Sequence, residues 1–146
     1  MRSVEDIAYW LSQIMVRFTD LVFTLKGVKH AVVIQKARQF IARRYAEKIT
    51  LDDVAAAVFL SPAYFSKVFN EEMGVSFTGY LNGVRIDRSR ELLRNSTVSL
   101  VDIAGLVGFD DQSYFTKVFK KMTGLSPGRY RDTAGRAVPS QEIHGR

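Results

Sequence analysis

Apolar residues recur along most of the chain at intervals of three and four, which is the period of an α-helix. The three prolines, at positions 62, 127 and 139, all lie outside the long periodic stretches. Because proline interrupts helices only from within, the pattern predicts an all-α chain. We expect helices over residues 4–26, 31–47, 51–58, 61–73, 76–95, 100–107, 112–123 and 127–132, with a turn at His30 and a flexible tail over 134–146.

Five of these helix starts carry capping signals. Ser3, Thr50 and Ser99 each stand three residues before an aspartate, the spacing at which a hydroxyl and a carboxylate cap each other's backbone amides. Ser61 and Ser126 each precede a proline, which fits the first helical position because the amide proton missing there has no intrahelical partner.

The first predicted helix has an apolar stripe with alternating three-and-four spacing, the heptad pattern of helices that pack on other helices. Such a stripe needs a cover, and we predict that a homodimer provides it. Two alternatives are that the helix folds back on its own domain, or that it is the remnant of a larger sensor domain. The predicted dimerisation residues are Ile7, Leu11, Ile14, Phe18, Leu21 and Leu25.

A sequence repeat with a spacing of fifty residues is the strongest signal in the chain. Residues 64–69, Tyr-Phe-Ser-Lys-Val-Phe, return at 114–119 as Tyr-Phe-Thr-Lys-Val-Phe. Upstream the two copies match with a spacing of one residue less, as in Val54-Ala55 and Ile103-Ala104, so the extra residue falls in a turn.

Each copy has the layout of a helix-turn-helix: a short helix with a small residue where two helices cross closely, a tight turn, and a longer helix. Phenylalanines four apart on the longer helix are predicted core residues. The opposite face carries small, hydroxyl, amide and basic side chains, which are types that contact base edges in a major groove. The predicted base-facing residues are Pro62, Ala63, Ser66 and Lys67, then Gln112, Ser113, Thr116 and Lys117.

The predicted helix over 76–95 joins the two copies. Its twenty residues span roughly 30 Å, close to the ~34 Å between successive major-groove segments on one face of B-form DNA. One chain could therefore occupy two such segments.

Charge supports a polyanionic partner, and other chemistry is weakly represented. Lysine and arginine total 21 against 15 acidic residues, a net charge of +6, which suits nucleic acid without proving it. With no cysteine and only His30 and His144, metal-ligand spacings are missing, and no phosphate loop or nucleophile motif occurs. We expect a protein that is not an enzyme, that needs no cofactor or metal, and that has no membrane span.

The repeat region, residues 34–131, resembles the DNA-binding domain of the AraC/XylS family of bacterial transcription regulators. The resemblance is most specific from Ile103 to Phe109, from Asp111 to Lys121, and at Gly124, Ser126-Pro127 and Tyr130-Arg131. It implies two helix-turn-helix units joined by a linker helix, recognition helices in adjacent major-groove segments, and activation by contact with RNA polymerase.

These observations predict a three-part chain: an amphipathic helix over 1–30, a double helix-turn-helix domain over 31–133, and a tail. Its expected function is sequence-specific binding of double-stranded DNA in the bacterial cytoplasm, at the nucleoid; the alternative is a helical adaptor that binds only proteins. After its core residues, the first recognition helix continues with Asn70-Glu71-Glu72, whereas the second continues with Lys120-Lys121. We therefore expect the second unit to attract phosphates more strongly. The predicted phosphate contacts are Ser61, Lys120, Lys121, Arg129 and Arg131.

Overall fold

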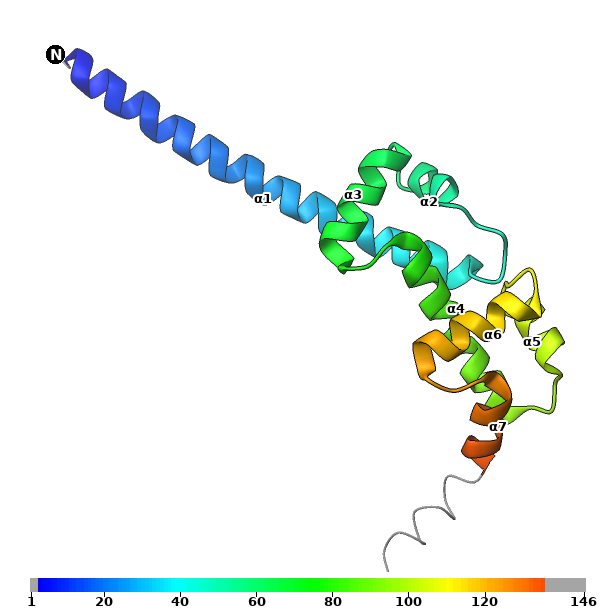
Figure 1. Cartoon of the computed structure of the whole chain (residues 1–146). Helices are drawn as coiled ribbons and strands as arrows, with labels where there is room; N and C mark the ends of the chain where they lie inside the picture. The colour runs from blue at the N-terminus through cyan, green and yellow to red at the C-terminus, as the bar shows by residue number, and fades with distance from the viewer. Residues whose placement is uncertain (1–2, 136–146) are drawn as a thin grey trace, which may run out of the picture.

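A computed structural model describes residues 3–135 and shows only helices and connecting turns over that range (Figure 1). The all-α prediction is confirmed. In chain order the helices are α1 (Val4–Arg44), α2 (Leu51–Ala57), α3 (Pro62–Met73), α4 (Phe77–Asn95), α5 (Leu100–Leu106), α6 (Gln112–Thr123) and α7 (Pro127–Gly135). Most of the predicted tail, residues 136–146 with His144, lies outside the described residues.

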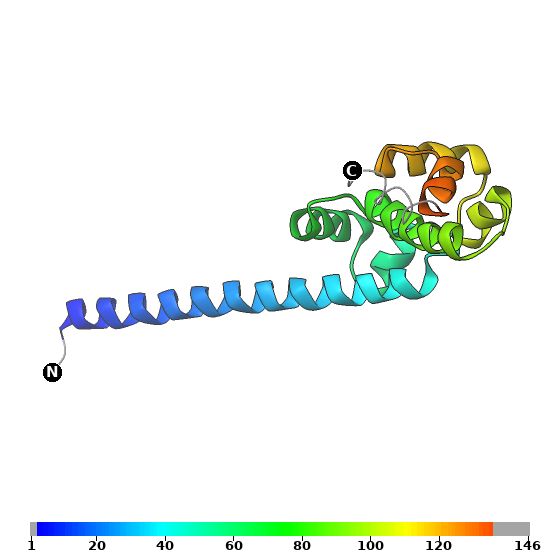
Figure 2. The ribbon, with the colours of Figure 1, turned by 90° about the horizontal axis from the view of Figure 1, so that it is seen from below.

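Helix α1 differs from the prediction, because it is one continuous helix of 41 residues where we expected two helices and a turn at His30. A glycine inside a helix, here Gly27, costs only about 1 kcal/mol relative to alanine. No proline occurs between residues 4 and 44 to block the backbone ladder. The C-terminal half of α1 packs in the body of the protein, while its N-terminal half extends away from it (Figures 1 and 2).

All five hydroxyls predicted to cap a helix accept a backbone amide, but Ser99 with Asp102 forms only this half of the expected capping box. Ser3 with Asp6, and Thr50 with Asp53, form complete capping boxes. The amide of Thr50 donates to the Asp53 carboxylate at 2.8 Å and lowers the pKa of that group. Ser61 caps α3 just before Pro62, and the Ser126 hydroxyl accepts from the Arg129 amide in α7.

Two apolar cores organise the body, one for each copy of the repeat. The first lies between α1, α2 and α3 around Ala37, Ile41, Val54, Phe65 and Phe69. The second lies between α4, α5 and α6 around Ile86, Leu93, Ile103, Phe115 and Phe119. The C-terminal half of α1 therefore takes the place in the first unit that α4 takes in the second.

Helix α4 is shared between the two units. Near its start, Leu81 belongs to the first core, and Tyr80 packs edge-on against Phe69 with 5.6 Å between ring centroids. Further along, Ile86 and Leu93 belong to the second core. The predicted linker helix is thus a structural part of both units, which fixes their separation along its axis.

A contact cluster centred on Arg85 joins the units beside α4. Its guanidinium donates to the carbonyl oxygens of Tyr45 (2.8 Å) and Glu47 (2.9 Å), both just beyond α1. It also lies over the ring of Phe109, in the turn of the second unit, at 5.7 Å. Partial burial lowers the pKa of Arg85, which nevertheless stays charged.

Candidate nucleic-acid interface

Helices α3 and α6 are the second helices of the two helix-turn-helix units, and they are built alike. Each has twelve residues, begins at an N-cap whose side-chain oxygen accepts a backbone amide (Ser61 or Asp111), and ends at a left-handed glycine. Gly74 has φ of 71° and Gly124 has φ of 85°, a conformation that glycine adopts without a steric penalty. The repeat in the sequence is therefore a repeat in backbone geometry.

One face of each helix is buried in its unit. Phe65, Val68 and Phe69 in α3 are matched by Phe115, Val118 and Phe119 in α6, all buried. The prediction that these phenylalanines are core residues is confirmed, and their burial fixes which face of each helix is left for a ligand.

The predicted base-facing residues lie away from these cores. We call Pro62, Ala63, Ser66 and Lys67 the first ridge, and Gln112, Ser113, Thr116 and Lys117 the second ridge. None of the eight is buried: Ser66, Gln112 and Thr116 are half-buried, and the other five are exposed. Exposure matches position by position between the ridges except at Pro62 and Gln112, so both helices offer the same kind of surface.

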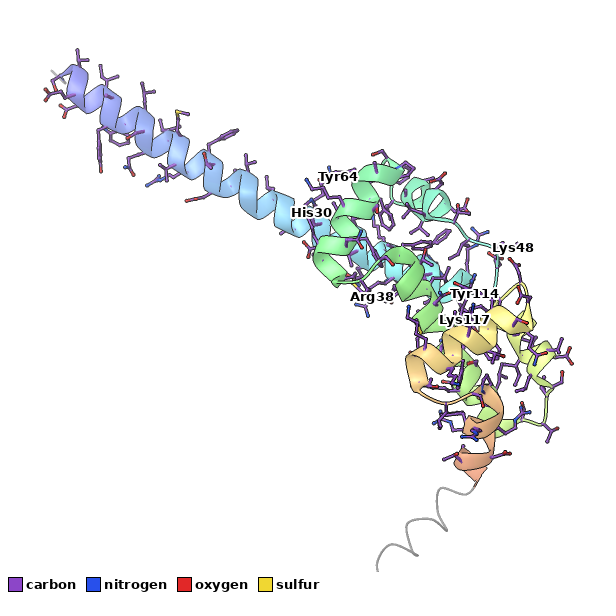
Figure 3. The ribbon with its side chains drawn as sticks, viewed as in Figure 1. His30, Arg38, Lys48, Tyr64, Tyr114 and Lys117 are labelled. Atoms are coloured by element: carbon purple, nitrogen blue, oxygen red, sulfur yellow. The ribbon has the colours of Figure 1, made fainter. Side chains whose placement is uncertain are left out.

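A tyrosine anchors each recognition helix to the helix that precedes its unit (Figure 3). The Tyr64 hydroxyl is hydrogen-bonded to His30 Nε2 of α1 at 3.0 Å. At the equivalent place, the Tyr114 hydroxyl accepts from Asn82 Nδ2 of α4 at 3.3 Å. These anchors were not predicted: the repeated tyrosine was visible, but its partners lie more than thirty residues away in the sequence.

The predicted phosphate contacts are placed unevenly. Ser61, Lys120, Lys121 and Arg129 are exposed, and Lys120 and Arg129 line one hollow together with Gly124, Leu125 and Ser126. This hollow lies between the end of α6 and the start of α7, so Arg129 of α7 lies near Lys120 of α6, the second recognition helix.

Arg131, also among the predicted phosphate contacts, makes structural hydrogen bonds that we did not predict. Its half-buried guanidinium donates to the carbonyl oxygens of Leu93 (3.2 Å) and Val98 (2.7 Å). These bonds tie α7 to the end of α4 and to the loop before α5. Because two of its five N–H groups already bond backbone carbonyls and the side chain is half-buried, we leave Arg131 out of the proposed phosphate contacts.

The ends of the two recognition helices differ in charge. Lys120 and Lys121 lie in the last turn of α6, whereas Glu71 and Glu72 hold similar positions in α3. Glu72 approaches His30 Nδ1 at 4.0 Å, so part of its charge faces α1. The end of α6 is therefore more positive than the end of α3.

Other kinds of site are not supported by the part of the chain that the structure describes. Within residues 3–135 there is no group of three or more histidine, cysteine or acidic side chains placed to hold a metal ion. None of the helices described there has the length and hydropathy needed to cross a membrane.

Comparison with known proteins agrees with this architecture. A family profile described as "Helix-turn-helix domain" matches residues 54–133. The regulatory protein PocR of Salmonella typhimurium is 39% identical over 102 residues, covering 70% of this chain and 34% of its own. The arabinose operon regulatory protein of Escherichia coli is 35% identical over 99 residues, covering 67% of this chain and 34% of its own. The chain thus spans about a third of the length of these relatives.

Solved structures give the same result. The C-terminal domain of AraT, a response regulator from Geobacillus stearothermophilus, superposes with a TM-score of 0.67 at 37% identity, covering 69% of this chain and 84% of that one. The DNA-binding domain of the global transcriptional factor AdpA, solved with a target DNA, superposes with a TM-score of 0.67 at 25% identity, covering 74% and 96%. The paired helix-turn-helix units joined through α4, together with these matches, show that the chain belongs to the AraC-type helix-turn-helix family of transcription regulators.

Proposed function

We propose that this protein is a transcription regulator that binds a specific double-stranded DNA site by inserting α3 and α6 into adjacent major-groove segments. The observation that carries the proposal is the pair of matched, unburied ridges on two helices of identical length. The similar AdpA domain was solved with a target DNA, which supports the same kind of ligand here.

The side chains of the ridges suit base recognition. Gln112 can pair bidentately with adenine, the hydroxyls of Ser66, Ser113 and Thr116 can bond several base edges, and Ala63 can contact a thymine methyl group. Ser61, Lys120, Lys121 and Arg129 would hold the flanking phosphates, which fix register without reading sequence.

We also include activation through contact with RNA polymerase, since the family resemblance implies it. A promoter fused to a reporter tests this part separately from DNA binding: the regulator should raise transcription from a promoter that contains the selected site. A fall in transcription would indicate a repressor and would refute this part alone.

The decisive experiment selects bound duplexes from a random pool and footprints the result. We expect one preferred site of about one and a half to two helical turns per chain. Gln112→Ala should weaken binding to that site by roughly 1–3 kcal/mol and relax the preference at one base pair. Gln13→Ala, an exposed glutamine of α1 outside both ridges, is the matched control and should bind as the wild type does.

The exposed apolar side chains of α1 favour one competing function, a helical adaptor that binds proteins and not DNA. Repeating the binding measurement at two salt concentrations distinguishes the two, because neutralising phosphates makes DNA affinity fall steeply with salt. Failure to enrich any sequence, with weak and salt-insensitive binding, would favour the adaptor.

A further inference from the structure

The N-terminal half of α1 has an apolar surface that the described part of the molecule does not cover. Side chains at the two heptad positions are all more than half exposed from Val4 to Val28, and Val32 is 45% exposed. We call this surface the α1 stripe; it consists of Val4, Ile7, Leu11, Ile14, Phe18, Leu21, Leu25, Val28 and Val32.

A helix this far from any tertiary contact needs a partner. Helices in proteins take most of their stability from packing of an apolar face, and propensity alone is marginal in water. Tyr9, Trp10 and Met15 add to the exposed apolar area beside the stripe. Contiguous apolar surface of this extent marks an interaction site.

The spacing of the α1 stripe indicates that the cover is another helix. The stripe keeps a strict seven-residue repeat over four heptads, as two helices that coil around each other require. The part of α1 that packs on its own domain uses a different register: the stripe would continue at Gln35 and Gln39, which are exposed, whereas the buried positions are Val33, Ile34, Ala37 and Ile41.

The α1 stripe also continues beside the domain without meeting it. Val28 and Val32 are exposed, yet Val33 and Ile34 next to them are only 8% exposed. Val32 and the buried Ala37 are five residues apart, which places them about 140° from each other around the helix axis. A second helix could therefore lie along the whole stripe while the domain occupies a different side.

Charge favours a second copy of this chain as that helix. Residues 4–29 contain three acidic and three basic residues, none of them at a stripe position, so the stripe itself brings no like charges together, and the chain's excess of positive charge lies elsewhere. A partner chosen by electrostatic attraction would be expected to meet a charged surface instead. A heptad stripe is complementary to itself, and a parallel, in-register pair covers all nine of its positions.

We propose that the α1 stripe is the interface of a homo-oligomer in which α1 helices pair in parallel and in register. This arrangement places the DNA-binding domains of two chains at the same end of the coiled coil. Each domain lies on the side of its own α1 that faces away from the partner helix. The proposal deepens the proposed function, because paired domains would read repeated sites on one duplex.

The mass of the chain in solution tests the interface. Over a dilution series in analytical ultracentrifugation, the wild type should sediment as an oligomer, and Leu11→Glu/Leu21→Glu should sediment as a monomer. Ser12→Glu/Thr19→Glu is the matched control: it adds the same charge at exposed positions of α1 outside the stripe and should behave as the wild type does. A monomeric wild type at every concentration, or equal effects of both double variants, would overturn the proposal.

Engineered cysteines test the orientation, since the chain has none of its own. In a parallel, in-register pair, Ile7→Cys and Leu25→Cys should each form a disulfide-linked dimer when oxidised alone. In an antiparallel pair these positions lie at opposite ends, so only a mixture of the two variants would cross-link, and that result would refute the parallel arrangement. Ser12→Cys, on another side of the helix, should not cross-link.

The interface can fail without the proposed function failing. A monomeric Leu11→Glu/Leu21→Glu variant should keep its affinity for a single site, because its two ridges are intact, and should lose only the added affinity for a pair of sites. If the variant lost binding to the single site while its helical content was unchanged, the assignment of the stripe to self-association would be wrong.

Discussion

At the scale of single residues, both helix-turn-helix turns contain one residue with positive φ, but the residue type differs between them. Phe59 follows the C-cap residue of α2, and Gly108 follows the C-cap residue of α5, so the two occupy equivalent places. Both have positive φ, 62° and 103°. Phe59 is 92% exposed. A β-carbon on Gly108 would lie 2.6 Å from the Tyr45 carbonyl oxygen and 2.8 Å from Arg85 Nε. Phe59 is therefore strained but unconfined, whereas a side chain at position 108 would be both strained and confined.

This difference predicts opposite outcomes for two substitutions. Gly108→Ala should lower the free energy of unfolding by at least about 2 kcal/mol, because a left-handed alanine adds strain to a steric clash with backbone. Phe59→Gly should leave it unchanged or raise it by less than about 1 kcal/mol, since relief of strain is offset by glycine's entropy in the unfolded chain. Chemical denaturation of both variants gives the two values; similar losses would contradict the assignment.

Arg131 illustrates the limit of assignment from residue type. Its position and charge in the sequence fit a phosphate contact, and only the folded structure brings it to the carbonyl oxygens of Leu93 and Val98. Those carbonyls are 38 and 33 residues away along the chain, a separation at which no local pattern indicates contact.

At the scale of elements, the two recognition helices share a fold but differ in charge. Exposed lysines end α6, while glutamates lie near the end of α3, one of them facing His30. Affinity for DNA depends on salt in proportion to the phosphates neutralised. The second helix-turn-helix unit should therefore contribute more of the electrostatic attraction.

We expect Lys120→Gln/Lys121→Gln to flatten the slope of log affinity against log salt by up to about 2. Lys29→Gln/Lys36→Gln removes the same charge from exposed positions of α1 and serves as the control. It should change the slope much less, because a screened charge acts only over roughly 10 Å. Equal changes in the two variants would mean that net charge, and not the end of α6, sets the salt dependence.

At the scale of the whole molecule, the relative placement of the two ridges depends on α4 and on the Arg85 cluster. Arg85 is the side chain that reaches the end of α1, the loop after it and the turn of the second unit together. An exposed ion pair between Lys48 and Asp110 at 3.2 Å also crosses this junction, but such pairs contribute little. The orientation of the units should accordingly be most sensitive to Arg85.

Arg85→Met should lower the free energy of unfolding by about 2 kcal/mol, because two backbone carbonyls lose a charged donor. The test compares the preferred site with a site lengthened by about five base pairs, an insertion that rotates the second half-site to the opposite face of the duplex. Arg85→Met should discriminate less between these two sites than the wild type does. Wild-type protein should lose most of its affinity for the lengthened site. Arg94→Met, the same change at an exposed position of α4, is the control and should discriminate as the wild type does; identical discrimination by Arg85→Met would show that α4 alone sets the orientation.

The sequence alone determined the features that local chemistry controls. Helix periodicity and the caps at Ser3, Thr50 and Ser61 are encoded within a few residues of each other, and the repeat makes Phe65 and Phe115 equivalent because it copies such a local pattern. Each follows from spacing on a helix or from the hydrogen bonds of its first turn. The helix-turn-helix pair and the faces of its second helices were predictable for that reason.

Only the tertiary structure decided how distant residues meet. The continuity of α1 through Gly27 reflects packing of its C-terminal half, which outweighs a small local cost. The tyrosine anchors and the hydrogen bonds of Arg85 and Arg131 to backbone carbonyls join residues more than thirty positions apart. These contacts depend on how the helices pack in three dimensions, and that packing, more than any local pattern, fixes where the two ridges lie relative to each other.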